Sequence, residues 1–346
     1  MSSSSYWSRR AALLMYDRIE SAEEISAEIA EIYRHAYNQI AHDLSGIFGK
    51  YEKAYGLSDK EAMCLLNTLA DPGDLKALKQ ALKKAGTEEA LQIKAMLDAP
   101  EYRRKIARLQ ALQDKINEIS RSIYQQDLTA QRRWYTGLCS DTYYQTIYNV
   151  QREVGFQFSF SHIDDKLIRK IMSSRWDGSG YSERLWRNVD GVAREVRKQL
   201  TWGYITGKSE QRMAAEIANK YAVGAFESRR LVRTEAAYLS SEIQAQAYKE
   251  CGADRYQYVA TLDSRTDEEC GALDRKIFNV KDRKPGINYP PMHPFCRCTT
   301  KIYIDQDTRA DMKRRARDPK TGKNKVIPAS VSYTEWAKQN GITPRK

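Results

Sequence analysis

Apolar residues recur every three or four positions along two stretches near the start of the chain. The first covers 25–51, where these positions form one stripe along about seven helical turns. The second covers 101–126, with charged residues on the opposite side. Between them, Ser58-Asp-Lys-Glu61 is a capping-box pattern and predicts another helix start. Because a lone helix cannot cover such a stripe, we expect an elongated hairpin or a small bundle.

The pattern changes in the middle of the chain. Residues 127–160 are rich in aromatic residues and lack a clean period, which favours an interface between elements. Further helical patterns, separated by short turns that contain glycine, follow at 163–171, 181–201, 209–221 and 225–249.

Beyond Gly252 the apolar period shortens to two. Residues 255–261 alternate as a strand does, residues 297–304 alternate again, and a loop with cysteines and a histidine lies between them. The sequence therefore predicts a mainly α protein with a small C-terminal α+β domain, built from two or three short strands around this loop. The expected segments are a long-helix region at 1–126, a central helical domain at 127–250, the α+β domain at 251–304 and a basic tail at 305–346.

Composition agrees with exposed helices rather than a large buried sheet. The chain has 346 residues, of which 41% are hydrophobic and 29% charged, and its mean hydropathy is -0.70. This length suffices for two compact domains, or for one domain with a long helical extension. No apolar run approaches the roughly 20 residues needed to cross a bilayer. We therefore expect synthesis and assembly in the cytosol, without a membrane partner.

Positive charge is concentrated at the C-terminal end. The formal net charge is +12, and residues 305–346 hold eleven Lys/Arg against five Asp/Glu, a net +6. Such a field attracts double-stranded DNA by counterion release, without sequence preference, although a solvated tail that keeps the protein soluble explains the charge equally well. The candidate DNA-contacting residues are Arg309, Lys313, Arg314, Arg315, Arg317, Lys320, Lys323 and Lys325.

The six cysteines do not describe a secreted disulfide scaffold, because their spacing is irregular outside one terminal cluster. Cys64 and Cys139 fit ordinary core thiols. The terminal cluster has the thiolate and imidazole donors that a zinc site needs, from Cys270, His293, Cys296 and Cys298. Two alternatives remain open: a packed thiol cluster without metal, or a Cys296 or Cys298 nucleophile with His293 as its base, which would require a third group to orient the histidine.

Two further motifs indicate structural rather than catalytic or ligand-binding roles. The string from Gly203 to Ser209 has three residues between its glycines where a phosphate loop needs four, so we interpret it as a helix stop followed by a Ser209 N-cap. Arg233-Thr-Glu235 lies inside a helical pattern. We expect Arg233 to pair with a carboxylate from a neighbouring helix or from the loop at Asp263.

The stretch 263–303 also resembles a known family. Its features are Asp263-Ser-Arg-Thr266, Leu273-Asp274, Phe278 and the closing Pro290-Pro-Met-His-Pro-Phe-Cys-Arg-Cys298. Together they resemble the C-terminal domain of phage minor head proteins, the head-morphogenesis family typified by the F protein of phage Mu. Weaker likeness extends over Tyr6-Trp7, Tyr181-Ser-Glu-Arg-Leu-Trp186, Gly207-Lys-Ser209, Arg233-Thr-Glu235 and Tyr333-x-x-Trp336.

The resemblance assigns structural roles to eight motif residues and exposes one departure. The eight are Arg233, Glu235, Asp263, Arg265, Thr266, Pro291, Pro294 and Arg297. Asp267 stands where family members often have the first cysteine of a Cys-x-x-Cys. Either a carboxylate from Asp263 or Asp267 replaces that ligand, or the zinc site is lost.

The resemblance implies a phage minor head protein that acts by binding, without catalysis. It would bind the portal protein and a major capsid or scaffolding protein, contact packaged double-stranded DNA, and act in procapsid assembly and in genome packaging or ejection. It would be found first in the host cytoplasm and then in the interior of the virion head. The alternatives are an ADP-ribosyltransferase or zinc-dependent effector delivered with the genome, and a free nucleic-acid-binding protein. The transferase would need a Glu-x-Glu turn, and neither Glu23-Glu24 nor Glu268-Glu269 supplies that spacing.

Overall fold

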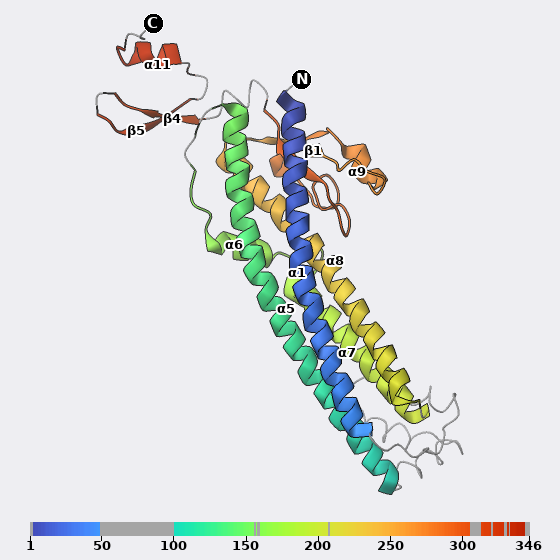
Figure 1. Ribbon diagram of the computed structural model, residues 1–346. Coiled ribbons are helices and arrows are strands. Elements are labelled where there is room, and N and C mark those ends of the chain that lie inside the picture. Colours follow the sequence, from blue (N-terminus) through green and yellow to red (C-terminus); the bar gives the residue numbers. More distant parts are fainter. Residues whose placement is uncertain are drawn as a thin grey trace. The chain divides into compact units, whose positions relative to one another are not determined.

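The computed structural model describes residues 3–48, 100–155, 157, 160–206, 208–304, 313–319, 321–328, 331 and 333–342 (Figure 1). The chain is mostly helical and divides into two compact units. Unit 1 comprises 1–25, 131–181 and 230–346, and unit 2 comprises 26–130 and 182–229. The segments expected at 1–126, 127–250, 251–304 and 305–346 divide the chain by position along the sequence and stay a prediction. In the structure, long helices contribute residues to both units.

In its described residues, unit 2 is a bundle of four helical segments. They come from α1 (Ser3–Phe48), α5 (Pro100–Val154), α7 (Tyr181–Thr206) and α8 (Glu210–Glu250). The predicted stripes form its core, since Ile29, Ile40 and Leu44 of α1 and Leu112 and Ile116 of α5 are fully buried. The bundle predicted from the stripes is confirmed for the described residues. The capping box at 58–61 and the thiol of Cys64 lie outside them.

Hydrogen bonds between polar side chains join the helices of unit 2. Gln113 of α5 donates to Thr201 of α7 at 3.3 Å, and Ser228 of α8 donates to the buried carboxylate of Asp127 at 2.9 Å. Asn188 of α7 donates both to the Tyr33 hydroxyl, at 3.3 Å, and to the Gly224 carbonyl, at 3.2 Å. Because buried polar groups are costly unless paired, these bonds favour one arrangement of the helices.

Helix α8 is continuous where two helices were expected. The predicted turn between 209–221 and 225–249 contains Gly224, which instead lies inside the helix. A Cβ at Gly224 would come within 2.5 Å of a Val192 methyl carbon and 2.9 Å of the Tyr33 ring. The glycine therefore permits close approach of helices rather than a chain reversal.

Helix α5 likewise continues through the aromatic stretch, whose lack of a clean period favoured an interface between elements. Its rings lie on several sides of the helix: Tyr135 and Tyr143 are buried, whereas Tyr148 is 52% exposed. Partners on more than one side remove the single apolar stripe that reveals a helix in a sequence. The short helix α6 (Asp165–Met172) follows, with the Asp164 side chain as its N-cap.

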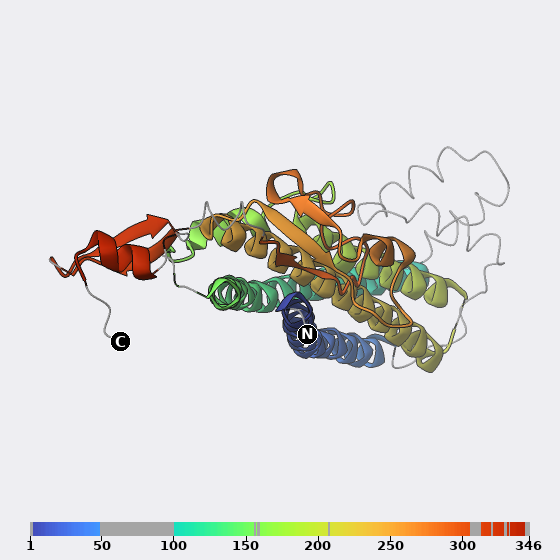
Figure 2. The same cartoon turned by 90° about the horizontal axis from the view of Figure 1, so that it is seen from above.

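In unit 1 a small antiparallel sheet packs on the C-terminal part of α8 (Figure 2). The sheet has the order β2-β1-β3, from β1 (Arg255–Val259), β2 (Ile277–Asn279) and β3 (Thr299–Ile302). Helix α9 (Glu268–Leu273) and the 3-10 turn η1 (Val280–Asp282) complete the α+β region. The predicted fold class, mainly α with a small α+β part, is confirmed.

The segment expected as a basic tail contains regular structure. Strands β4 (Lys313–Arg317) and β5 (Asn324–Pro328) form an antiparallel ribbon, and helix α11 (Tyr333–Gln339) follows. Charge alone suggested a solvated chain, but the turn at 318–323 satisfies its own backbone groups and so closes a hairpin. Arg309 and Lys320 lie outside the described residues. Among the described helices, none is long and apolar enough to span a membrane.

Replacement of Gly224 by alanine should destabilise unit 2 by about 1–3 kcal/mol, because the added Cβ would overlap Val192 and Tyr33. Gly191 provides the control: it lies in α7 with open space around it, so alanine there should be neutral or stabilise by up to about 1 kcal/mol through helix propensity. Chemical denaturation of both variants measures the difference. Equal stability of the two variants would contradict the close approach at Gly224.

Candidate metal centre

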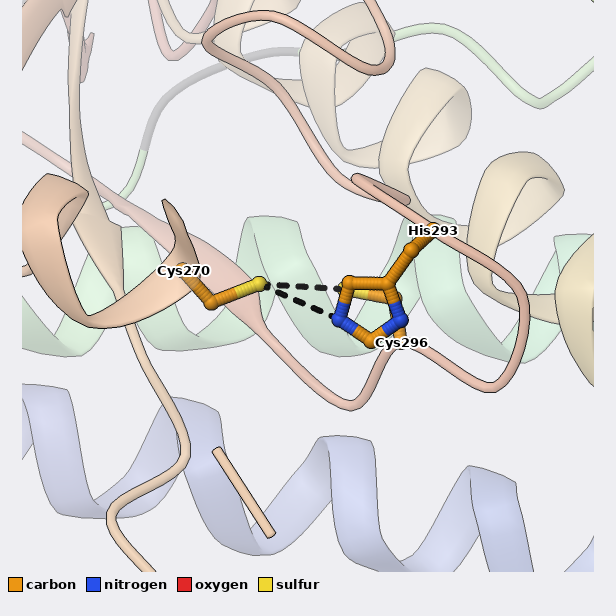
Figure 3. A group of neighbouring side chains, drawn as sticks. All are labelled: Cys270, His293 and Cys296. Carbon is orange, nitrogen blue, oxygen red and sulfur yellow. Dashed lines mark hydrogen bonds between the residues drawn. The ribbon is translucent and has the colours of Figure 1, made fainter. Parts of the chain in front are cut away.

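Three predicted ligands come together at the edge of the small sheet (Figure 3). Cys270 lies on α9, whereas His293 and Cys296 belong to the loop that leads into β3. Their ligand atoms all lie within 4.8 Å of one another, with 3.4 Å between Cys270 Sγ and His293 Nε2 and 3.9 Å between the two sulfurs. Both cysteines are buried, and hydrogen bonding with the neighbouring Cys298 thiol together with burial raises their pKa values.

These separations suit a tetrahedral zinc ion. With Zn–S bonds of about 2.3 Å and a Zn–N bond of about 2.0 Å, two sulfurs would lie about 3.8 Å apart and sulfur and nitrogen about 3.5 Å apart. The orientation of the imidazole is also suitable. His293 Nδ1 lies 2.8 Å from the carbonyl oxygen of Pro294, so this nitrogen carries the proton and Nε2 presents its lone pair towards Cys270.

The buried Tyr258 lies next to the cluster and supports it. Its hydroxyl donates to Cys270 Sγ at 3.5 Å, a bond that would stabilise a thiolate ligand from outside the metal shell. Desolvation and the neighbouring thiols raise the pKa of Tyr258, so the hydroxyl keeps its proton as a donor. Sequence reasoning missed this residue. The strand alternation of 255–261 was the available signal, since it places Tyr256 and Tyr258 on one face.

Cys298 packs in the same buried cluster but outside the three-residue group. Hydrogen bonds with the thiols of Cys270 and Cys296 lower the pKa of Cys298. It lies directly before β3 rather than within the expected strand at 297–304. Three of the four predicted ligands are thus brought together, and the fourth lies against their sulfurs.

Neither aspartate replaces the missing cysteine. Asp263 forms an ion pair with Arg297, whose guanidinium contacts both carboxylate oxygens, and this contact holds the Asp263 pKa below its usual value. Asp267 caps α9 by accepting from the Glu269 amide at 3.0 Å. Both carboxylates fix the loops around the cluster, and the soft donors remain as the candidate ligands.

Several motif residues hold the loop at Asp263 in place. Thr266 Oγ1 accepts from the Asp263 amide and donates to the Thr261 carbonyl, and Thr261 in turn donates to the Arg297 carbonyl at 2.7 Å. Arg265 is exposed, and its amide donates to Asp263 Oδ1 at 2.9 Å. These contacts link the first and last parts of the family motif around the thiols.

Contacts with α8 hold the proline-rich loop. The Phe295 amide donates to Thr234 Oγ1 at 3.3 Å, and the Arg233 guanidinium lies 5.1 Å from the centre of the Phe295 ring. Arg233 also pairs with Glu23 of α1 at 2.9 Å, which confirms the predicted ion pair with a neighbouring helix. Thr234 was not predicted, although it lies inside the Arg-Thr-Glu motif.

The remaining predicted residues also have structural partners. Glu235 is buried and lies 3.5 Å from the indole nitrogen of Trp176. Pro291 accepts from the Gly286 amide at 2.9 Å. Ser209 lies directly before α8 and accepts from the Arg212 amide at 3.4 Å, in agreement with the predicted N-cap. Cys139 is a buried thiol, and burial raises its pKa to about 12.

Comparison with known proteins supports the resemblance. Residues 194–301 match the family described as Phage Mu protein F like protein, so the chain carries a phage Mu F-like region that includes α8, the sheet and the cysteine-histidine cluster. The chain is also similar to NAD(+)--arginine ADP-ribosyltransferase EFV of Enterococcus faecalis (strain ATCC 700802 / V583), with 25% identity over 221 residues. The match covers 59% of this chain and 44% of that relative, so the chain spans less than half of the relative's length. No solved structure matches.

An Arg233→Ala variant should loosen the proline-rich loop, because it removes the contacts with Glu23 and Phe295 together. We expect a loss of about 1–3 kcal/mol and faster amide hydrogen exchange over 290–298. Arg230→Ala, at an exposed position one turn earlier on α8, serves as the control and should leave that exchange unchanged. Hydrogen exchange with mass spectrometry resolves the segment. Unchanged protection of 290–298 in Arg233→Ala would disprove this anchoring role.

Proposed function

We propose that this protein is a phage minor head protein that binds the portal and acts by assembly rather than by catalysis. The observation that carries the proposal is the match of 194–301 to the phage Mu F-like family. It gains support from the contacts of the motif residues, because Arg233, Asp263, Thr266 and Arg297 all fix loops and helices of one small region. Motif residues that make such structural contacts are consistent with a protein that acts by binding.

Portal binding is proposed from the family match alone. The apolar stripes of 25–51 and 101–126 do not offer a surface for it, because in unit 2 their described residues cover one another. The partner therefore has to contact other surfaces. The proposal also includes the major capsid or scaffolding protein as a partner, an early place in the host cytoplasm, and non-specific contact of the basic C-terminal segment with packaged DNA.

Co-expression with its cognate portal protein should yield a complex that survives gel filtration and elutes ahead of the portal alone. The Arg233→Ala and Gly224→Ala variants show whether an intact fold is needed. If the folded wild-type chain stays separate from the portal when all capsid proteins are present, portal binding is wrong.

We further propose that the cysteine-histidine cluster holds a structural zinc ion, through Cys270, His293, Cys296 and Cys298. Four protein ligands would close the shell, so the ion would stabilise the small domain and leave no position for an activated water. The two ring nitrogens of His293 have partners that suit a ligand: a backbone carbonyl for Nδ1 and the Cys270 sulfur for Nε2. The catalytic alternative paired His293 with a Cys296 or Cys298 nucleophile, whereas Nε2 of His293 contacts Cys270.

Transferase activity is not proposed for this chain. The name of the Enterococcus relative raises that activity, but the match covers 44% of the relative. In this chain Glu23 pairs with Arg233, while Glu268 and Glu269 occupy the first turn of α9. None of these carboxylates forms the Glu-x-Glu turn that the transfer reaction needs.

Elemental analysis of protein purified without chelator should give about one zinc per chain. Cys270→Ser and Cys298→Ser should lower the zinc content towards zero and reduce thermal stability, because each removes a proposed ligand. Cys139→Ser changes a buried thiol of the same unit and should keep the zinc. A folded wild-type domain with almost no zinc would leave the packed-thiol interpretation.

A further inference from the structure

The C-terminal segment forms a small unit of two strands and a helix, built from β4, β5 and α11 (Figure 1). The turn that joins the strands is fixed by its own hydrogen bonds. The Asp318 amide donates to the Lys323 carbonyl and the Gly322 amide to the Asp318 carbonyl, each at 2.8 Å. The Asp318 side chain accepts from the Thr321 amide at 3.0 Å, and Gly322 adopts the positive φ that the turn requires. The ribbon is therefore a defined element rather than an unstructured run of charge.

The strand register sorts the basic residues onto two faces. Lys313, Arg315 and Arg317 alternate along β4 and pair with Pro328, Val326 and Asn324 of β5. Arg314 and Ala316 occupy the other face, opposite Ile327 and Lys325. We call the first the open face and the second the α11 face.

Burial and one contact distinguish these faces. On the α11 face, Ala316 and Ile327 are partly buried, and Lys325 Nζ lies 3.5 Å from Asn340, directly after α11. On the open face, Arg317 and Asn324 are exposed, and Val326 is 52% exposed. Among the residues whose exposure is described, those of the open face, Arg317, Asn324 and Val326, are thus exposed to solvent, whereas Ala316 and Ile327 of the α11 face are partly buried.

The open face has the charge of a polyanion-binding surface. Its three basic residues on β4 are opposed by uncharged residues on β5, and the one acid of 313–328, Asp318, lies in the turn beside Lys325 at 3.7 Å. Residues two apart on a strand are separated by about 6.8 Å, so the row of positive residues spans about 14 Å. A regular row of positive charge with one exposed apolar neighbour suits a partner with regularly repeated negative charge.

We propose that the open face of the β4–β5 ribbon binds the phosphate backbone of duplex DNA. A two-stranded ribbon fits the major groove, and contacts with phosphates position a protein without reading sequence. The inference rests on the DNA contact of the proposed function and deepens it, because it assigns that contact to one face of one element. Net charge alone would make every Lys and Arg of 313–325 equivalent.

Arg315 and Arg314 provide a matched pair of sites. They are neighbours of the same residue type, so Arg315→Gln and Arg314→Gln remove the same charge from opposite faces. Binding of the full-length variants to a fluorescent duplex of random sequence is measured by anisotropy across a salt series. The slope of log affinity against log salt should fall by about 0.9 for Arg315→Gln and by about 1.8 for Lys313→Gln with Arg315→Gln, since each phosphate contact contributes about 0.9. Arg314→Gln should keep the wild-type slope, and Arg315→Lys should restore it.

The outcomes separate the two levels of the proposal. Equal loss for Arg314→Gln and Arg315→Gln would overturn the face assignment while leaving DNA contact by diffuse charge. Tighter binding to single-stranded DNA of the same length, or to vesicles with anionic lipid, would overturn duplex DNA as the partner. No binding by the wild-type chain would remove the DNA contact altogether. Portal binding is measured separately, so it can stand when the ribbon assignment fails.

Discussion

The small sheet and the loop before it are held on α8 by hydrogen bonds of buried side chains, and the position of the cysteine-histidine loop depends on them. Tyr289 donates to the Ser241 carbonyl, Tyr248 and Thr300 share a hydrogen bond of 3.2 Å, and Gln244 contacts Thr299 at 3.4 Å. Inside a dry interface an unpaired hydroxyl costs about 1–3 kcal/mol, so a shift of the sheet along the helix would be penalised at several residues together. The hydrogen bonds thus fix the sheet at one position along α8. At this position the loop at 290–298 lies over the turn of α8 that contains Arg233 and Thr234.

The family motif follows from this constraint. A loop with little regular backbone pairing needs other anchors, and Arg233, Thr234 and Arg297 provide them through Phe295 and Asp263. The thiols and imidazole then gather at the point where α9 and the loop meet. The motif contains many residues with specific contacts, because a short loop with little backbone pairing needs several side chains to hold it in place.

The sequence was sufficient for elements with a single repeating signal. The stripes of 25–51 and 101–126 predicted helices whose described residues form the bundle, and the spacing of Cys270, His293 and Cys296 predicted their meeting. It was insufficient where a residue has a role that depends on a distant neighbour. From the sequence we placed Gly224 in a turn, but in the structure it lies inside α8, close to Tyr33 and Val192.

Pairing across the chain was equally hidden from the sequence. Asp263 was considered as a replacement for the missing cysteine ligand, and the sequence did not reveal that its partner is Arg297, 34 residues away. The hydroxyl of Tyr258 supports Cys270, but a tyrosine in an alternating strand does not reveal which atom it will meet. In the C-terminal segment we interpreted the high charge as a basic tail and did not predict the hairpin. The available signal for the hairpin was the short turn at Asp318 and Gly322.

The strand edges affect whether copies of the chain aggregate when they are close together. Unpaired strand edges recruit strands from other chains and so promote aggregation. Here β3, one edge, has all four of its residues buried, and β2, the other, is only three residues long. The β4–β5 ribbon has basic residues along β4, and charges of one sign oppose the stacking of copies edge to edge. A chain with such edges can reach a high local concentration without joining its copies into a continuous sheet.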